Sequence, residues 1–217
     1  MTRRRLTAAL VDYGAGNLAS VARALTGLGW RCRISRDTET LVAADVLVLP
    51  GVGAFPAAMA ALHQHHLVEV IQTQARRGQP IVGICLGMQL LADSSSEHQI
   101  CAGLGLIPGQ VLPLTAARWH IGWNSIEVLG DEPLLKPSDG QSLYFNHAYA
   151  FQAPAEYTVA VARIGAAAAP GRAPADTNTP FTAAVRRGNI VGLQFHPEKS
   201  QIAGRELLRK VVEGLLP

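Results

Sequence analysis

Gly83-Ile-Cys-Leu-Gly87 stands at the junction between an apolar strand-like run, Pro80–Ile84, and a helix-like run, Met88–Ala92. Glycines two residues on either side of Cys85 let the strand and the helix approach closely, while the cysteine stands exposed at the turn, as in a nucleophile elbow. The dipole and free N–H groups of a helix N-terminus favour the reactive thiolate. The commoner explanation of such a cysteine taken alone is burial in a Gly-rich turn, so other segments must decide between the two.

A histidine and a carboxylate follow an apolar strand near the C-terminus. Ile190–Phe195 alternates its side chains between two faces, and Pro197 then ends the strand and fixes a turn. His196 and Glu198, two residues apart, can therefore lie on the same side. A nucleophile, a base and a group that orients the base are the three parts of an activated thiol. His-Pro-Glu alone is typical of a surface turn, but together with the elbow it favours a catalytic triad of Cys85, His196 and Glu198.

A third segment could stabilise negative charge. Val46-Leu-Val-Leu-Pro-Gly-Val-Gly53 is an apolar strand that runs into a Gly-rich turn. Backbone N–H groups at Val52 and Gly53 could face a developing oxyanion, together with the N–H of Leu86 after the nucleophile. Such a turn alone is weak evidence for an oxyanion site. Its position, one strand–helix unit before the elbow, strengthens that interpretation.

These segments resemble the class I (triad) glutamine amidotransferases. The elbow and Gln-Phe-His-Pro-Glu198 indicate the class, and the similarity extends in order along nearly the whole chain. Within the class, two stretches resemble the glutaminase subunits that serve imidazole glycerol phosphate synthesis in the histidine pathway. These are Asp12-Tyr-Gly-Ala-Gly-Asn-Leu18 and His120-Ile-Gly-Trp-Asn124. The further stretches that carry the resemblance are Pro50–Phe55, Gly103–Gly109, Tyr144–Tyr149 and Gly192–Ser200.

The order of apolar runs predicts one α/β domain over residues 1–217 with a flavodoxin-like fold. Strands alternate with helices in the first half, which predicts a mostly parallel sheet covered by helices on both faces. The expected strands are Leu6–Val11, Arg31–Ile34, Val46–Leu49 and Ile81–Ile84, and the expected helices are Asn17–Leu28, Ala54–His63 and Leu67–Arg77. Ligands bind at the carboxyl ends of such strands, where Gly53 and Cys85 both fall.

The second half predicts an antiparallel extension of the sheet that returns His196 and Glu198 to Cys85. Its expected strands are Gln110–Leu114, Ser125–Val128, Ser142–Phe145, Tyr157–Arg163, Phe181–Val185 and Ile190–Phe195. Ile202–Leu216 is expected to form a closing helix. Gly165–Pro180, rich in Ala, Pro and Gly, is expected to be a flexible surface loop.

The resemblance implies hydrolysis of glutamine to glutamate and ammonia through a thioester on Cys85. It implies further that the ammonia passes to a partner, a cyclase subunit with a (β/α)8-barrel fold, as a heterodimer. That partner would make imidazole glycerol phosphate and an aminoimidazole carboxamide ribotide. By the same resemblance, the substrate contacts are Gly53, Gln89, Glu97, Tyr144, His147 and Ala148, and the partner-facing residues are Asn17, Trp123, Tyr144 and Lys199. From the residues alone, Trp123 is equally a core anchor and Lys199 a plain surface lysine.

Two positions depart from the pattern of these subunits. Ala148 stands where a hydroxyl residue is expected after the loop histidine, so a side-chain hydrogen bond to glutamine would be lost while backbone contacts survive. Arg118-Trp119 stands where Lys-Pro or a similar pair is expected. Neither position belongs to the triad.

Composition limits the classes of function. The net charge is +3 with a pI near 9.0, but no basic stripe interleaved with aromatic residues indicates nucleic-acid binding. No apolar run approaches the roughly 20 residues that span a bilayer, and because Asp12 interrupts the segment after Arg3-Arg-Arg5, no signal peptide is expected there. Three cysteines, an odd number, favour a reducing cytoplasm over a disulfide framework, with Cys32 and Cys101 structural. His63, His65 and His66 lack the accompanying ligands of a metal site, and no cofactor is expected.

Three rival functions share some of these sequence features. The nearest is a class I glutaminase that serves another acceptor, in pyridoxal phosphate, anthranilate or guanylate synthesis; Asp12–Leu18 and His120–Asn124 weigh against it. An interaction-only protein with an inactive triad is disfavoured by the intact Cys85, His196 and Glu198. A cysteine peptidase on a related flavodoxin-like scaffold is disfavoured by the placement of Gln-Phe-His-Pro-Glu.

Overall fold

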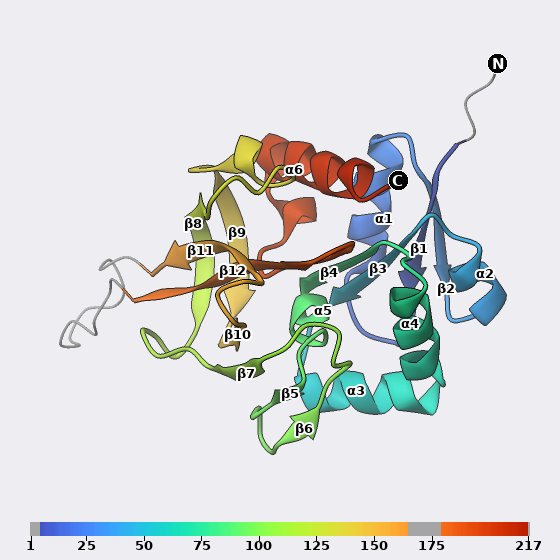
Figure 1. The fold of residues 1–217 in the computed structure, drawn as a ribbon, viewed down its shortest axis with the longest axis horizontal. Coiled ribbons are helices and arrows are strands. Elements are labelled where there is room, and N and C mark those ends of the chain that lie inside the picture. Colours follow the sequence, from blue (N-terminus) through green and yellow to red (C-terminus); the bar gives the residue numbers. More distant parts are fainter. Residues whose placement is uncertain (1–4, 165–178, 217) are drawn as a thin grey trace.

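A nine-stranded sheet runs through the centre of the computed structural model (Figure 1), which describes residues 5–164 and 179–216. Its strands, in spatial order, are β2 (Arg31–Ser35), β1 (Thr7–Val11), β3 (Val46–Gly51), β4 (Ile81–Cys85), β13 (Ile190–Leu193), β12 (Pro180–Arg187), β11 (Thr158–Arg163), β8 (His120–Val128) and β9 (Ser142–His147). The first five are mutually parallel and the last four antiparallel. The predicted α/β class is therefore confirmed.

β13 lies at the boundary between the two halves of the sheet. It pairs antiparallel with β12 on one side and parallel with β4 on the other, with Leu193 opposite Ile84. The sequence placed Ile190–Phe195 in the antiparallel extension, and this is correct for only one of its two edges. The parallel pairing aligns the carboxyl ends of β4 and β13, so the segment after β13 emerges beside Cys85.

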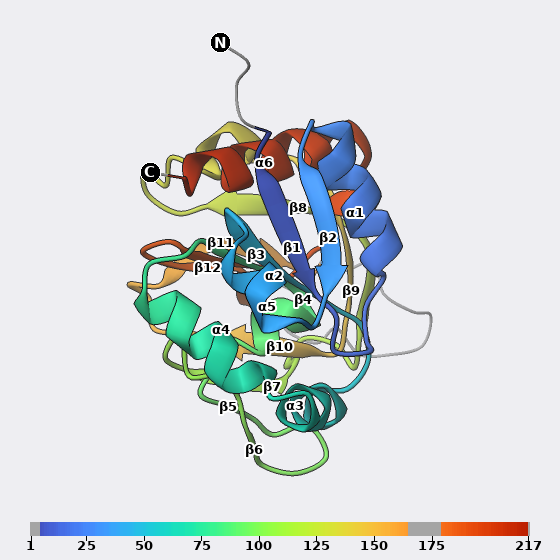
Figure 2. The ribbon, with the colours of Figure 1, turned by 90° about the vertical axis from the view of Figure 1, so that its right-hand side faces the viewer.

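Helices cover both faces of the parallel half, as Figure 2 shows. On one face lie α1 (Leu18–Gly27) and α6 (Gln201–Gly214), and on the other lie α3 (Phe55–Gln64) and α4 (Leu67–Arg76). Sequence reasoning missed the short α2 (Thr38–Val42), whose Asp37 cap accepts a hydrogen bond from the Thr40 N–H at 2.9 Å. Five residues are too few for a helical period to be recognised.

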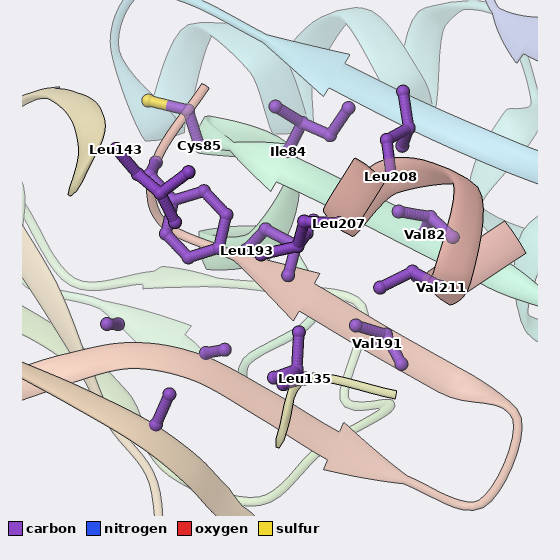
Figure 3. Packing of buried hydrophobic residues seen from close by; sticks show 14 of the residues in the cluster. Val82, Ile84, Cys85, Leu135, Leu143, Val191, Leu193, Leu207, Leu208 and Val211 are labelled. Atoms are coloured by element: carbon purple, nitrogen blue, oxygen red, sulfur yellow. The ribbon is translucent and has the colours of Figure 1, made fainter. Parts of the chain in front are cut away.

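Two apolar cores result from the alternation of side chains along the strands. Figure 3 shows Leu207, Leu208 and Val211 of α6 packed over side chains from β4 and β13, with Cys85 at the end of β4. Ala9 and Val11 of β1 face the opposite core, where they pack with side chains from α3 and α4. Because β3 and β4 are buried at every position, their carboxyl ends are held rigidly at the centre of the sheet edge.

A smaller four-stranded sheet packs below the main one in Figure 1. It comprises β10 (Tyr149–Gln152), β7 (Gln110–Pro113), β5 (Ser94–Ser95) and β6 (Cys101–Ala102). The sequence placed Gln110–Leu114 in the main sheet, and this is wrong, because β7 pairs with β10 and β5 instead. The chain passes from β9 to β10 at Ala148, so one continuous extended segment serves both sheets.

Other elements are short. These are α5 (Leu86–Gln89) and the 3-10 turns η1 (Lys136–Ser138) and η2 (Pro197–Lys199). Most of the Gly165–Pro180 segment, expected to be a flexible loop, lies outside the described residues. In the part of the chain that the structure describes, no helix has the length and apolar character needed to cross a membrane.

Gly87 provides a test of the packing that fixes the elbow. A methyl group at Gly87 would overlap the Leu49 carbonyl in β3, whereas one at Gly27 of α1 would meet nothing within 4 Å. We expect Gly87→Ala to lower the free energy of unfolding by about 3 kcal/mol or more, because a backbone contact cannot yield. Gly27→Ala, the matched control, should leave stability unchanged or raise it by up to about 1 kcal/mol. Denaturant unfolding measures both, and equal stability of the two variants would contradict the close contact.

Candidate active site

The elbow places Cys85 in a strained backbone conformation at the end of β4. Its φ of 55° and ψ of −112° are rare for a residue with a side chain, and its exposed fraction is 6%. Such strain costs about 1–3 kcal/mol and is typically retained at functional positions. The helix after Cys85 is only the four-residue α5, shorter than the run to Ala92 that the sequence suggested, because the chain turns toward β5.

His196 lies directly after the Leu193–Phe195 segment and is held from several sides. Its Nδ1 contacts Glu198 Oε1 at 2.8 Å, and both side chains are almost fully buried. Its backbone N–H donates to the Tyr144 carbonyl at 2.8 Å, and its carbonyl accepts from the Ser200 hydroxyl at 2.6 Å. With Nδ1 engaged by Glu198, Nε2 is the nitrogen left to face Cys85.

The environment of His196 favours its charged form. Burial alone lowers the pKa of His196, but hydrogen bonds to Cys85 and Glu198 outweigh it and raise that pKa to about 9. A carboxylate that binds Nδ1–H fixes the tautomer and stabilises the imidazolium, so His196 can accept and return a proton at Nε2.

The predicted oxyanion turn follows β3. Gly51, the last residue of β3, pairs with Cys85, so the Val52–Gly53 segment emerges beside the thiol. Gly53 has a φ of 109°, a conformation that glycine adopts readily, while Val52 is 44% exposed. The buried Tyr13 hydroxyl donates to the Pro50 carbonyl at 2.7 Å and so holds the strand that leads into this turn.

A pocket of about 240 Å³ opens over Cys85 and brings together most of the predicted site residues. It is lined by Val52, Gly53, Cys85, Leu86, Gln89, Glu97, Asn146, His147, Ala148, Tyr149 and His196. Glu198 lies behind His196. Elements that are far apart in sequence therefore converge at the carboxyl edge of the sheet, as parallel topology requires.

Two polar residues of the pocket are fixed by hydrogen bonds. Gln89 Nε2 donates to the Tyr149 carbonyl at 3.0 Å and to Gln194 Oε1 at 3.1 Å. Glu97 Oε2 accepts the backbone N–H of Phe55 at 2.7 Å, at the N-terminus of α3. The loop after β5 is therefore tied to the helix that follows the oxyanion turn.

Sequence reasoning missed Gln194 and His120. Gln194 is fully buried, and its Nε2 lies 3.8 Å from Cys85 Sγ as a hydrogen-bond donor. A glutamine in an otherwise apolar run, Ile190–Phe195, was the available signal, since a buried amide needs polar partners. His120 contacts His147 from the neighbouring strand, which only the strand pairing reveals.

Tyr144 is not among the residues that line the pocket. Its ring lies 6.0 Å from that of Trp123 and 5.7 Å from Lys199 Nζ, next to the triad but on the outer face of β8 and β9. Trp123 is 49% exposed, so it is not a core anchor. Asn17 caps α1 by accepting the Ser20 N–H at 3.2 Å.

Cys32, Cys101 and His65 lie outside this pocket. Burial raises the pKa of the thiols of Cys32 and Cys101, and both are unpaired. His65 Nε2 contacts Arg36 on the surface. Within residues 5–164 and 179–216, no group of three or more His, Cys, Asp or Glu side chains is arranged to hold a metal ion.

The fold and the pocket agree with comparisons to known proteins. The chain belongs to the class-I glutamine amidotransferase family, whose model matches residues 9–213. It is 43% identical over 208 residues to "Imidazole glycerol phosphate synthase subunit HisH" of Streptococcus gordonii, with 94% of each chain covered. It is 40% identical over 204 residues to the subunit of that name from Listeria monocytogenes, with 92% of each covered. The predicted family is confirmed.

Solved structures share the fold at low sequence identity. The structure of PurLQS from Thermotoga maritima superposes with a TM-score of 0.72 at 19% identity, covering 97% of this chain and 99% of the other. A crystal structure of a glutamine amidotransferase gives a TM-score of 0.69 at 20% identity, with 95% and 98% covered. At this identity, the likeness concerns the fold alone.

The His196–Glu198 contact makes a prediction about pH. Glu198→Gln should lower the pKa of His196 by about one unit or more, because the carboxylate that favours the imidazolium is lost. In the wild type, the raised pKa stabilises the fold fully below about pH 6.5, and this stabilisation is lost as the pH rises through about 9. NMR titration of the imidazole measures the pKa directly. Glu206→Gln, an exposed carboxyl on α6, is the control and should leave the titration of His196 unchanged.

Proposed function

We propose that this chain is the glutaminase subunit of imidazole glycerol phosphate synthase. The observation that carries the proposal is the pocket, in which the Cys85 thiol lies between the His196–Glu198 pair and the Val52–Gly53 turn. The family supplies the reaction class, and the names of the full-length relatives supply the pathway.

The first half-reaction forms a thioester. His196 Nε2 takes the proton of Cys85, and the thiolate attacks the side-chain carbonyl carbon of glutamine. The N–H groups of the Val52–Gly53 turn and of Leu86 bind the oxyanion of the tetrahedral intermediate. The C–N bond then breaks, and ammonia leaves with the proton that His196 returns.

The second half-reaction releases glutamate. His196 accepts a proton from water, the hydroxide attacks the thioester carbonyl, and the C–S bond breaks to restore the Cys85 thiolate. Glu198 keeps the imidazole in one tautomer through both steps, because its bond to Nδ1 leaves only Nε2 to exchange protons.

Pocket residues recognise the rest of the substrate. Gln89, Glu97 and the Asn146–Tyr149 segment line the pocket together with Cys85 and His196. Glu97 attracts the α-amino group of glutamine by its charge. Ala148 offers only backbone groups, so this chain binds glutamine without a side-chain hydroxyl at that position.

The partner is a cyclase subunit with a (β/α)8-barrel fold, which uses the ammonia. An exposed apolar row on the outer face of β8 supports a docking surface next to the triad. Ile121 and Trp123, with Trp119 just before the strand, alternate outward and are 63%, 49% and 57% exposed. Tryptophan side chains of this kind are enriched at the centres of interfaces.

This row leads toward the pocket. Trp123 pairs with Tyr144 across the strands, and Ile121 pairs with Asn146, which lines the pocket. Ammonia released at Cys85 would therefore emerge beside the surface that the partner covers. Lys199, beside Tyr144, places a cation at the same edge.

The assay that tests this function compares the wild type with Cys85→Ala, each alone and with the cyclase bound to its phosphoribulosyl ligand. We expect glutamate release by the wild type to rise strongly with the ligand-bound cyclase. Cys85→Ala should lose about a thousandfold or more of the rate, because the thioester cannot form. Glutaminase activity that the cyclase does not change would indicate another acceptor synthase. A folded wild type without activity under any condition would contradict the triad.

The docking surface is tested by Trp123→Ala. Loss of a central aromatic side chain should weaken binding of the cyclase by about tenfold to a hundredfold. Ile100→Ala is the matched control, since Ile100 is 88% exposed beside β6 in the smaller sheet and should leave the affinity unchanged. Calorimetric titration of each variant gives the dissociation constants. Equal weakening by both substitutions would place the interface elsewhere.

A further inference from the structure

Two buried histidines lie opposite each other beside the pocket. His120 of β8 and His147 of β9 are paired across the strands, and His120 Nδ1 lies 3.1 Å from His147 Nε2. Both are less than a tenth exposed, and the rings of Phe145 and Phe181 pack around them. His147 lines the pocket, whereas His120 does not, and the proposed reaction gives His120 no part.

The hydrogen-bond partners fix the protons of both rings. His147 Nδ1 lies 2.9 Å from the Tyr149 carbonyl, which can only accept, so Nδ1 carries the hydrogen. In the neutral ring Nε2 is then an acceptor, and its donor is His120 Nδ1–H. His120 Nε2 in turn faces the amide NH2 of Asn124 at 3.5 Å, and that amide also donates to the Arg163 carbonyl at 2.6 Å. The hydrogen bonds therefore run in one direction, from the Asn124 amide to His120, from His120 to His147, and from His147 to the Tyr149 carbonyl.

Burial keeps both rings neutral, as this arrangement requires. It lowers the pKa of His120, and it lowers the pKa of His147 to about 4, with a nearby His120 and His196 acting in the same direction. A second proton would place two N–H groups against each other between the rings. Among the described residues, the hydrogen-bond partners of the two rings are each other, Asn124 and the Tyr149 carbonyl, none of which is a carboxylate.

The chain of hydrogen bonds ends on groups that shape the glutamine pocket. The Tyr149 carbonyl accepts from His147 and also from Gln89 Nε2. Gln89 continues to Gln194, whose Nε2 faces Cys85 Sγ. His147 and Gln89 therefore share the Tyr149 carbonyl as a hydrogen-bond acceptor.

We propose that His120 is a positioning residue for glutamine binding. It donates a hydrogen bond to His147 Nε2 and so fixes the tautomer in which His147 Nδ1–H donates to the Tyr149 carbonyl, the group that also accepts from Gln89. The inference rests on the proposed glutaminase function for its kinetic consequence, but the tautomer can be tested without it. The competing explanation is that His120 is only an aromatic ring that fills the space between Phe145 and Phe181.

The first experiment is a long-range 1H–15N NMR spectrum of the full wild-type chain at neutral pH. The proposal expects His147 and His120 both to carry their hydrogen on Nδ1. Nε2–H on His147, or a charged ring, would overturn it. This measurement needs no variant and no activity, so it can overturn the proposal even where a substitution impairs folding or the chain serves another acceptor.

The second experiment separates the hydrogen bond from the ring. His120→Phe keeps an aromatic ring and removes the donor, whereas His120→Asn removes the ring and keeps an amide N–H near the position of Nδ1. In the complex with the cyclase, we expect His120→Phe to raise KM for glutamine about tenfold, with kcat within about threefold of wild type. His120→Asn should restore KM to within about threefold of wild type.

The opposite order would overturn the proposal: a wild-type KM for His120→Phe and a raised one for His120→Asn would leave His120 as packing alone. Equal KM values for both variants would also overturn it, because the donor would then make no difference. Absence of glutamine hydrolysis by the wild-type complex would instead contradict the proposed function, while the NMR result on the tautomer would stand.

Discussion

The parallel pairing of β3, β4 and β13 is the constraint on which the site depends. Gly51 lies opposite Cys85, and Leu193 lies opposite Ile84, so three segments leave the sheet at one edge within contact of each other. Buried side chains on both faces of these strands fix that register, because a slip by one residue would turn each apolar set toward the wrong face. The predicted oxyanion turn, the thiol and the histidine are thereby brought together at one edge of the sheet.

At this edge, two buried histidines have pKa values shifted in opposite directions. Burial lowers the pKa of both, but at His196 the hydrogen bonds to Cys85 and Glu198 outweigh it and raise the pKa. At His147 burial dominates and the pKa falls, although the hydrogen bond to the Tyr149 carbonyl acts in the opposite direction. Two histidines in one pocket therefore differ in charge for physical reasons that burial alone does not explain. One is suited to move a proton, and the other to hold a fixed hydrogen bond.

The chain order of apolar runs, glycines and turns was sufficient to predict most elements. The elbow glycines could be recognised because the backbone at position 87 lies so close to the Leu49 carbonyl that only glycine fits there. Such a local requirement is visible as a glycine in the sequence. The sequence did not predict α2, β5, β6 or β10, and it assigned β7 to the wrong sheet. These elements are short or lack a clear period. Short strands are defined by what they pair with, and pairing between distant segments leaves no local pattern.

By itself, the sequence determined the family and the α/β class, and it predicted a triad of Cys85, His196 and Glu198, since each follows from residue types at fixed local spacing. Only the tertiary structure decided which side chains meet. It placed Tyr144 with Trp123 outside the pocket, brought the buried Gln194 to Cys85, and set His120 against His147. Those contacts join residues that are between 21 and 109 positions apart in the sequence. They exist only because burial of the apolar side chains fixes the register of the strands that carry these residues.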